Sequence, residues 1–379
     1  MINKQRLVDE FIELVKIDSE SLDEKNIADV LEKKLRDLGL EVWRDDAGKK
    51  YGGNAGNVMG RLKGNTGGEP LLFAAHMDTV KPGRGVKPVI ENDIIKSDGT
   101  TVLGGDDKSG IVAILEMIRV IKENNMQHGD IEVLFTFGEE IGLLGAKTVD
   151  TSKLKARQGF ALDSEEVSKI VYKAPAQNSM EFEIFGKESH AGVAPEKGVS
   201  AIEVAADAIN HMKLGRIDAE TTANIGMIEG GRATNIVTGY VKMKGEARSH
   251  NLEKLGKQTR SMIEAVWDAV ERSKKYSSEG LMIARSKETV EREYDRISVD
   301  TNELSAQLAY KAINEVGLKA EFVEMGGGSD ANILNGKGIK MVILGTGMSN
   351  VHTKEEYIKI SDMVDITRIV LNIIKFAYA

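Results

Sequence analysis

Acidic and histidine side chains recur along this chain directly after short apolar or glycine-rich segments. The set comprises His76 and Asp78 in LLFAAHMDTV, Asp106 in LGGDDKSG, Glu139 and Glu140 in FTFGEE, Asp163 in GFALDSEE and His352 in NVHTKEEY. Carboxylate oxygens and imidazole nitrogens are the hard and borderline ligands that divalent cations prefer. The set as a whole therefore indicates a hydrolytic site with two metal ions.

His76 and Asp78 lie two residues apart at the end of a predicted strand. Because side chains alternate along a strand, both should point to the same side. Asp78 could then orient the His76 imidazole, since a carboxylate on the second ring nitrogen fixes the tautomer and raises ligand basicity. A buried structural histidine beside a loop aspartate is the alternative.

Two pairs of adjacent acids carry further chemistry. Asp106 follows two glycines, which permit a tight backbone path, so its two oxygens could bridge both cations. Helix N-capping is the ordinary alternative, and Asp107 could supply that cap. Glu139 and Glu140 would repel each other unless cations neutralise them. One could bind metal while the other accepts a proton, although a surface turn is also open.

The first half of the chain alternates between short strand-like and longer helix-like segments, which is typical of an α/β domain. Strands are predicted at 40–43, 57–62, 71–75, 131–137 and 159–162, and a buried helix at 111–121. Sites in open α/β sheets form outside the carboxyl ends of strands. The acids and histidines that follow these strands are therefore expected to converge.

The pattern changes near Pro175, where two helical segments are flanked by alternating segments in the order β-α-β-β-α-β. This order favours an inserted α+β domain with an antiparallel sheet at 176–293. The remaining segments, 1–175 and 294–379, would form one discontinuous catalytic domain. A length of 379 residues fits two domains.

The composition narrows the classes of protein. A net charge of −8 argues against nucleic-acid binding. The absence of cysteine excludes disulfides, thiolate zinc sites and cysteine nucleophiles. The N-terminus predicts an amphipathic helix rather than a signal peptide, and no apolar run is long enough to span a membrane. A cytoplasmic protein without nucleic-acid or membrane partners is expected.

Eight motifs together resemble one dinuclear metallohydrolase family. They are AAHMDTV, GGDDKSG, FGEEIG, LDS, SHAGVAPEKGVSAI, GGRATNIV, GGGSDAN and NVHTKEEYI. The family is the zinc metallopeptidase and aminoacylase group of clan MH, with peptidase T, glutamate carboxypeptidase, acetylornithine deacetylase and succinyl-diaminopimelate desuccinylase. The resemblance covers essentially the whole chain. The residues DDK in the motif GGDDKSG and the final HTKEEYI are most similar to the peptidase T-like branch.

The resemblance implies a role for each matching residue. It implies metal ligands at His76, Asp106, Glu140, Asp163 and His352, with Asp106 bridging two ions. Zinc is expected, with cobalt or manganese as alternatives. It implies Glu139 as general base, Asp78 as the orienter of His76, and an oxyanion-stabilising role for His190, in its own or a partner's active site. A surface-loop histidine is the alternative for His190. Substrate contacts are implied at Asn235, Arg248, Gly327 and Ser329.

The same resemblance implies an architecture and an activity. The fold would be α/β, a mixed-sheet catalytic domain of zinc-peptidase type with an inserted ferredoxin-like lid and dimerisation domain, which would form a homodimer. The activity would be exopeptidase cleavage of di- or tripeptides, as in an aminopeptidase, through a metal-bridging water and a glutamate base. An N-acyl-amino-acid deacylase is the alternative within the same chemistry. A non-catalytic, metal-binding dimeric scaffold is the alternative of another class.

Overall fold

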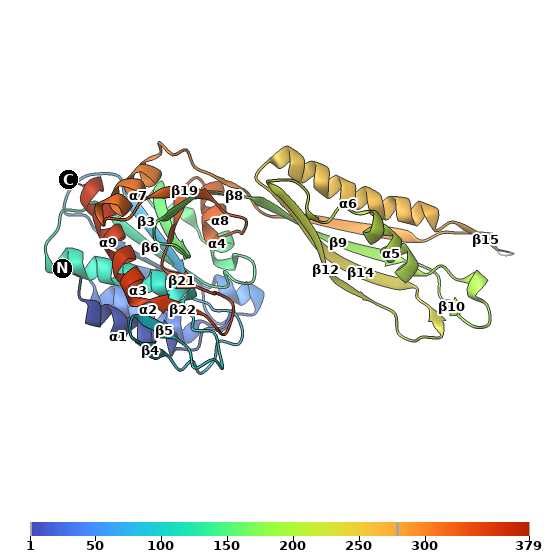
Figure 1. Cartoon of the computed structure of the whole chain (residues 1–379), viewed down its shortest axis with the longest axis horizontal. Helices are drawn as coiled ribbons and strands as arrows, with labels where there is room; N and C mark the ends of the chain where they lie inside the picture. Colours follow the sequence, from blue (N-terminus) through green and yellow to red (C-terminus); the bar gives the residue numbers. More distant parts are fainter. Residues whose placement is uncertain (1, 278–279, 379) are drawn as a thin grey trace. The chain divides into compact units, whose positions relative to one another are not determined.

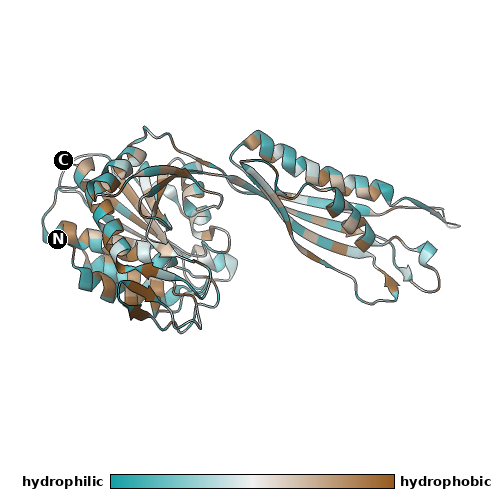
Figure 2. Cartoon of the chain, in the orientation of Figure 1, coloured by the Kyte–Doolittle hydropathy of each residue, from teal (hydrophilic) through white to brown (hydrophobic). Residues whose placement is uncertain are grey.

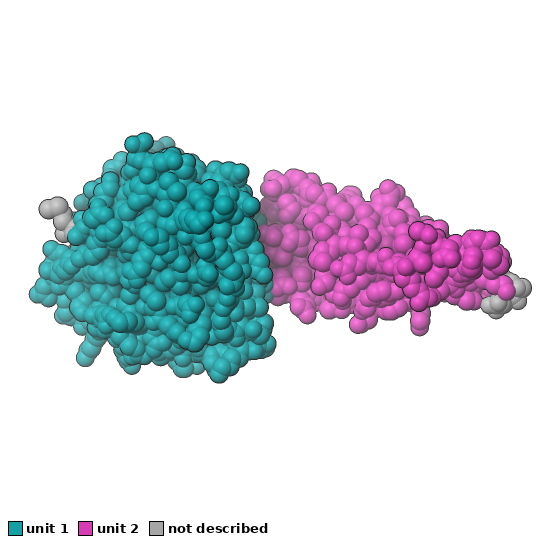
Figure 3. All heavy atoms as spheres, turned by 90° about the horizontal axis from the view of Figure 1, so that it is seen from below, with its two compact units in different colours: residues 1–174, 297–379 teal, residues 175–296 magenta. Residues whose placement is uncertain are grey.

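The computed structural model describes residues 2–277 and 280–378 and divides the chain into two compact units. Unit 1 comprises Met1–Ala174 and Ile297–Ala379, and unit 2 comprises Pro175–Arg296 (Figure 3). Each unit has its own cluster of buried apolar side chains. In the described residues, no helix combines the length and apolar character needed to cross a bilayer.

Unit 1 is built on a nine-stranded mixed sheet in the order β1-β2-β6-β3-β7-β20-β8-β18, with β19 pairing β8 (Figure 1). The strands are β1 Glu41–Arg44, β2 Val58–Leu62, β3 Leu71–His76, β6 Ile131–Thr136, β7 Gln158–Ser164, β8 Lys169–Ala174, β18 Ile297–Ser298, β19 Glu321–Glu324 and β20 Lys340–Gly345. The four central strands, β6-β3-β7-β20, are parallel neighbours. Their carboxyl ends therefore meet at one edge of the sheet.

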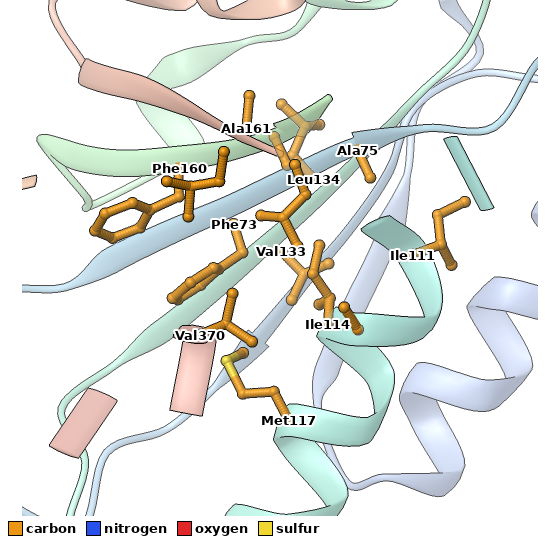
Figure 4. Packing of buried hydrophobic residues seen from close by; sticks show 14 of the residues in the cluster. Phe73, Ala75, Ile111, Ile114, Met117, Val133, Leu134, Phe160, Ala161 and Val370 are labelled. Carbon is orange, nitrogen blue, oxygen red and sulfur yellow. The ribbon is translucent and has the colours of Figure 1, made fainter. Parts of the chain in front are cut away.

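Helices cover this sheet. They are α1 Lys4–Val15, α2 Lys25–Asp37, α3 Gly105–Glu123, α4 Leu144–Thr148, α7 Leu304–Glu315, α8 Asp330–Gly336 and α9 Ile360–Ala377. Helix α3 packs on β3 and β7 and contacts α1 and α9. Phe73 and Phe160 stack with ring centroids 5.3 Å apart, and Figure 4 shows Ile114 and Met117 of α3 beside this part of the sheet. The predicted buried helix is thus the centre of the unit 1 core.

Shorter elements complete unit 1. A four-stranded sheet has the order β21-β22-β5-β4. Its strands are β4 Val89–Glu91, β5 Ile94–Lys96, β21 Met348–Ser349 and β22 Tyr357–Lys359. Single 3-10 turns lie at Ala47–Tyr51 and Thr151–Lys153. The β21–β22 turn brings a late segment of the chain, 350–356, into unit 1.

Unit 2 has the main order β9-α5-β12-β14-α6-β17. These elements are β9 Ala176–Phe185, α5 Ala201–His211, β12 Thr221–Gly230, β14 Tyr240–Ser249, α6 Leu252–Arg272 and β17 Arg285–Tyr294. The sheet runs β11-β12-β14-β9-β17 with antiparallel neighbours, where β11 is Gly215–Arg216. Helices α5 and α6 pack on each other and on β9 and β14. This is the ferredoxin-like arrangement that the alternating pattern predicts.

The cores follow from the sequence periodicity. Residues of β9 alternate between buried and partly exposed, so Met180, Phe182 and Ile184 share one face with the helices. Apolar residues gather on the inner strands of unit 1, whereas α6 carries both polar and apolar residues (Figure 2). Unit 2 also contains two small two-stranded sheets. One pairs β10 Ser189–His190 with β13 Ile236–Val237, and the other pairs β15 Lys275–Ser277 with β16 Gly280–Met282. A 3-10 turn lies at Pro195–Lys197.

The predicted mixed α/β class is confirmed, and the predicted strands agree with β1, β2, β3, β6 and β7 to within one or two residues at each end. Two details are wrong. The predicted strands place Asp163 beyond residue 162 and His76 beyond residue 75. Instead, β7 continues to Ser164, which still pairs with Gly345 of β20, and β3 includes His76, which pairs with Thr136 of β6. The helix predicted at 111–121 lies within α3. Whether unit 2 acts as a lid stays a prediction.

Because each unit has its own hydrophobic core, a core substitution in one unit should lower the stability of that unit alone. The Phe182 side chain is 0% exposed in the unit 2 core, so Phe182→Ala should destabilise that unit by ~3–5 kcal/mol. Phe160→Ala makes the matched change in unit 1, within β7, the strand that carries Asp163 and pairs with β3, which ends at His76. Calorimetry and metal content check the pair. The Phe182 variant should keep its metal affinity while the Phe160 variant loses some, and equal losses in both would contradict the separation.

Candidate metal centre

The carboxyl edge of the parallel strands positions most of the predicted ligands. His76 is the last residue of β3, Asp163 lies near the end of the neighbouring β7, and Glu140 follows β6. Asp106 comes from the first turn of α3, just after Gly104, which has a φ of 76°. A left-handed conformation of this kind favours glycine. His352 lies in the turn between β21 and β22.

The structure brings these five side chains together around Asp106. Asp106 Oδ1 lies 2.9 Å from His76 Nε2, and Asp106 Oδ2 lies 3.2 Å from His352 Nε2. His76 Nε2 is also 3.9 Å from Asp163 Oδ1, and His352 Nε2 is 3.0 Å from Glu140 Oε1. Each oxygen of Asp106 thus faces a different histidine. This arrangement suits a carboxylate that bridges two cations.

The spacing and burial of the ligand atoms also fit divalent cations. One ligand atom each from His76, Asp106 and Glu140 can be chosen within 4.8 Å of one another. Glu140 Oε1 is buried and has no hydrogen-bond partner among the described residues, since its contact with His352 lacks hydrogen-bond geometry. A buried carboxylate oxygen without a donor is costly unless a cation compensates it. The cluster therefore fits the expected metal pair.

Asp107 lies in the same region but has other partners. It forms a second group within 4.8 Å with His76 and Asp163. However, Asp107 Oδ2 accepts the His76 backbone N–H at 3.2 Å, and Oδ1 accepts the Gly110 N–H at 3.1 Å. The Gly110 bond is a helix cap, because the backbone at Asp106 and Asp107 is non-helical and the regular helix follows them. Asp107 thus orients the start of α3.

The packed acids shift one another's titration. Burial, followed by the Asp106 charge, raises the pKa of Asp163 to about 7 against the opposing effect of His76. Burial and then Asp163 raise the pKa of Glu139 well above its usual range. The adjacent carboxylates of Asp106 and Glu140 raise the pKa of His352 to about 10. Positive charge is thus needed here to stabilise the ionised carboxylates. Groups with such perturbed pKa values are typical of functional sites.

Asp78 connects the histidine to the Glu139–Glu140 turn. Its side chain is 0% exposed, with Oδ1 3.5 Å from His76 Nδ1, and its backbone carbonyl oxygen lies 3.1 Å from the same nitrogen. The carboxylate also accepts the backbone N–H groups of Glu139 at 2.9 Å and Glu140 at 3.2 Å. The hydrogen-bond partner of His76 Nδ1 is thus the Asp78 carbonyl, with the carboxylate beside it, and the orienting role expected for the carboxylate stays a prediction. Asp78 also holds the turn that carries the expected general base, which the sequence did not indicate.

The loop before α8 supports Asp163. Ser329 is 0% exposed and donates from Oγ to Asp163 Oδ2 at 2.7 Å. Ser329 is also the N-cap of α8, in a capping box with Asn332. Gly327 lies half-buried in the same loop. Ser329 thus touches an expected ligand directly, and the substrate contacts expected for Gly327 and Ser329 stay predictions.

Three predicted site residues lie in unit 2. His190 is exposed, and its Nδ1 accepts the Gly192 N–H at 3.1 Å. Asn235 is its neighbour, since the Asn235 carbonyl accepts the Ala191 N–H at 2.9 Å. The Arg248 guanidinium instead donates twice to Glu246, at 2.9 and 3.0 Å. The roles expected for His190, Asn235 and Arg248 stay predictions.

Sequence reasoning missed several buried polar residues around the cluster. Glu356 accepts the N–H groups of Leu103, Gly104 and Asp106, and Lys108 donates to Ser19 and to the Met77 carbonyl. Thr136 donates to Asp330, whose pKa burial raises to about 6. Ser21 and Glu24 contact the Asp78 and Glu139 region. Lys108, Glu356 and Asp330 stand inside the motifs quoted above, whereas Ser21 and Glu24 stand outside them all.

Comparison with known proteins identifies the family. The model of peptidase family M20/M25/M40 matches residues 72–375. YqjE of Bacillus subtilis (strain 168), which carries the description uncharacterized protein, is 45% identical over 378 residues, all of both chains. Among solved structures, aminopeptidase PepT from Bacillus cereus ATCC 10987 is 44% identical with a TM-score of 0.90, covering 100% of each chain. A tripeptidase from Staphylococcus aureus subsp. aureus Mu50 is 41% identical with a TM-score of 0.93, covering 100% of this chain and 99% of its own.

The family model spans well over half of the chain, and its match agrees with the resemblance carried by the motifs. The His, Asp and Glu cluster supplies the donors for divalent-metal binding. The chain therefore belongs to peptidase family M20/M25/M40 and is a metallo-exopeptidase.

Proposed function

We propose that this protein is an aminopeptidase that cleaves short peptides, tripeptides above all, with Glu139 as general base. The observation that carries the proposal is the position of Glu139, whose backbone is tied to Asp78 and which directly precedes the expected ligand Glu140. Support for tripeptides comes from the similarity to the aminopeptidase PepT and to the tripeptidase, both above 40% identity over the whole chain.

The metal pair would be held by His76, Asp106, Glu140, Asp163 and His352, with Asp106 between the two ions. When bound, two divalent cations polarise a scissile carbonyl and lower the pKa of water. Zinc, cobalt and manganese all suit these donors. Asp78 would orient His76 for this role, and Ser329 would fix one oxygen of Asp163.

Glu139 would perform the proton transfers. Its carboxylate would accept a proton from the attacking water and deliver it to the leaving amine. Burial and the Asp163 charge raise the pKa of Glu139, which is the direction expected of a carboxylate that accepts a proton. His190 would donate to the developing oxyanion, and Asn235, Arg248, Gly327 and Ser329 would contact the substrate.

A homodimer through unit 2 is part of the proposal. The outer edge of β12 pairs with β11 only at Ala223 and Thr222, so Asn224–Gly230 is an open edge among the described residues. Met227 and Ile228 on this edge are 52% and 54% exposed. Open edges with apolar side chains are usually covered. A cytoplasmic location stays a prediction.

The activity is tested with metal-stripped protein to which zinc, cobalt or manganese is restored, on di- and tripeptides beside N-acetyl amino acids. Metal-dependent release of the N-terminal residue from tripeptides would support the proposal. Turnover of the acylated amino acids alone would favour a deacylase. Metal binding without any turnover would favour a non-catalytic scaffold.

Loss of the base should separate catalysis from metal binding. Glu139→Gln removes the proton acceptor but keeps the shape, so kcat should fall by roughly 10²–10⁴-fold. Metal content should stay at the wild-type value because Glu139 is not an expected ligand. Steady-state kinetics and elemental analysis measure the two quantities, with Glu140→Gln as the matched variant that should lose metal. Wild-type kcat in the Glu139 variant would contradict its role.

Metal binding should release protons near neutral pH. Without a cation, His352 with a pKa of about 10 is protonated at pH 7 and must lose that proton to coordinate metal. Apparent metal affinity should therefore rise with pH up to about 10. The stability of metal-stripped protein should change with pH in the opposite direction to its metal affinity. The raised pKa of His352 adds to the free energy of unfolding at low pH, and this contribution is lost as pH rises through about 10.

Calorimetry in buffers of different ionisation enthalpy counts the released protons. His352→Gln should release fewer protons than the wild-type protein, whereas His211→Gln, on the exposed end of α5, should release the same number. An affinity independent of pH from 6 to 9 would contradict the ligand role of His352.

The open edge of β12 predicts the site of dimerisation. Ile228→Lys places a charge on that edge and should shift the protein from dimer to monomer. Ile90→Lys is the matched control, since Ile90 lies in unit 1 and is 49% exposed. Light scattering after size exclusion measures the mass of each variant. A wild-type monomer, or a dimer that survives Ile228→Lys, would count against this interface.

A further inference from the structure

A short segment between α1 and α2, residues 18–24, lies against the chain that follows β3. The Thr79 N–H donates to the Ser19 carbonyl at 3.0 Å, and the Ser21 N–H donates to the Thr79 carbonyl at 3.3 Å. Glu20 and Thr79 form an isolated parallel bridge. The segment is thus fixed beside Asp78, although some 57 positions separate Ser21 from Asp78 in the sequence.

Ser21 completes the partners of the Asp78 carboxylate. Its Oγ donates to Asp78 Oδ2 at 2.7 Å. The same carboxylate accepts the backbone N–H groups of Glu139 and Glu140 and faces His76 Nδ1. A carboxylate with donors on several sides has little freedom to rotate. The Ser21 hydroxyl therefore helps to fix the direction in which Asp78 holds the Glu139 backbone.

Glu24 contacts the same turn one residue earlier, at Gly138. Its side chain is 0% exposed, and Oε1 accepts the Gly138 N–H at 3.0 Å and the Leu22 N–H at 2.9 Å. Gly138 immediately precedes Glu139 and has a φ of 57°. An added Cβ there would lie 3.1 Å from Leu144 Cδ1. The backbone around Glu139 is thus held at the Gly138 N–H by Glu24 and at the next two N–H groups by Asp78.

The segment adopts this shape at a cost to the fold. Leu22 has a φ of 73°, a left-handed conformation that is unfavourable for a residue with a side chain. Burial, and then the Asp78 charge, raise the pKa of Glu24 to about 7, so an ionisable group is kept where its charged form is disfavoured. Such costs concentrate at functional sites. The bonds that compensate them converge on the Glu139 turn.

We propose that Ser21 and Glu24 are positioning residues for the general base. They touch no reacting atom. Glu24 fixes the Gly138 N–H and Ser21 fixes Asp78, and together these contacts set the direction of the Glu139 carboxylate. The inference rests on the function proposed above, in which Glu139 transfers the proton. It assigns a catalytic contribution to the 18–24 segment, which carries none of the expected ligands.

The test compares Glu24→Ala with Glu24→Gln in the full-length, zinc-loaded protein on trialanine. Misplacing a catalytic group by about 1 Å can cost on the order of 10²-fold in rate. Glu24→Ala should therefore lower kcat by about 10- to 100-fold, with KM and bound zinc unchanged. Glu24→Gln should restore kcat to within about threefold, because an amide oxygen can accept the same two N–H groups. Ser21→Ala, which removes one bond, should lower kcat by about 3- to 10-fold.

Glu132→Ala is the matched control for a merely structural role. Glu132 is also 0% exposed and accepts two backbone N–H groups, those of Lys155 and Ala156, but it pairs in addition with Arg61 at 2.7 Å and lies at the amino end of β6, away from Glu139. This variant should lower the melting temperature and leave kcat unchanged. Its kcat therefore separates a loss of stability from a loss of position.

The outcomes are distinguishable. Wild-type protein that fails to cleave trialanine with any metal would overturn the proposed function itself. Wild-type activity together with an unchanged kcat in Glu24→Ala would overturn only the positioning role, as would a Glu24→Gln variant no better than Glu24→Ala. Loss of zinc in parallel with kcat would also overturn it. Should Glu24→Ala fail to fold, Ser21→Ala decides, and wild-type kcat in that variant rejects the inference.

Discussion

The concentration of negative charge around Asp106 is the constraint on which the rest of the structure depends. Asp106, Glu139, Glu140, Asp163 and Asp330 occupy one small region of unit 1, and the positive groups near them include the imidazoles of His76 and His352, the buried Lys108 and Lys337. Such a cluster is unstable as a set of bare anions. It becomes favourable when divalent cations neutralise it, which links the fold of this edge to metal binding.

The parallel strands bring these acidic side chains to one place. Because β6, β3 and β7 are adjacent and parallel, residues that are far apart in the sequence leave the sheet at the same edge. His352 reaches Asp106 in a different way. It lies in the turn between β21 and β22, and the small sheet that contains these strands places this turn beside Asp106. A second layer of buried groups, Asp78, Ser329 and Glu356, then holds the backbone and the carboxylates in place.

The sequence was sufficient to predict that these acids and histidines gather at one edge of the sheet, because several such residues after apolar strands have few structural explanations when taken together. The α+β pattern of unit 2 was equally readable, since β9 alternates along its whole length. The supporting contacts were not predictable. Ser21 and Glu24 lie in a short polar segment without periodicity, and only the tertiary fold shows that Glu24 is buried on Gly138. Likewise, nothing local signals that Ser329 binds Asp163 or that Arg248 pairs with Glu246.

Anomalous diffraction from zinc-loaded crystals would reveal directly whether two metal ions bind with Asp106 between them. We expect two zinc peaks, one on each side of the Asp106 carboxylate, with His76 bound to one ion and His352 to the other. A single peak, two peaks that share one histidine, or zinc away from Asp106 would contradict this expectation.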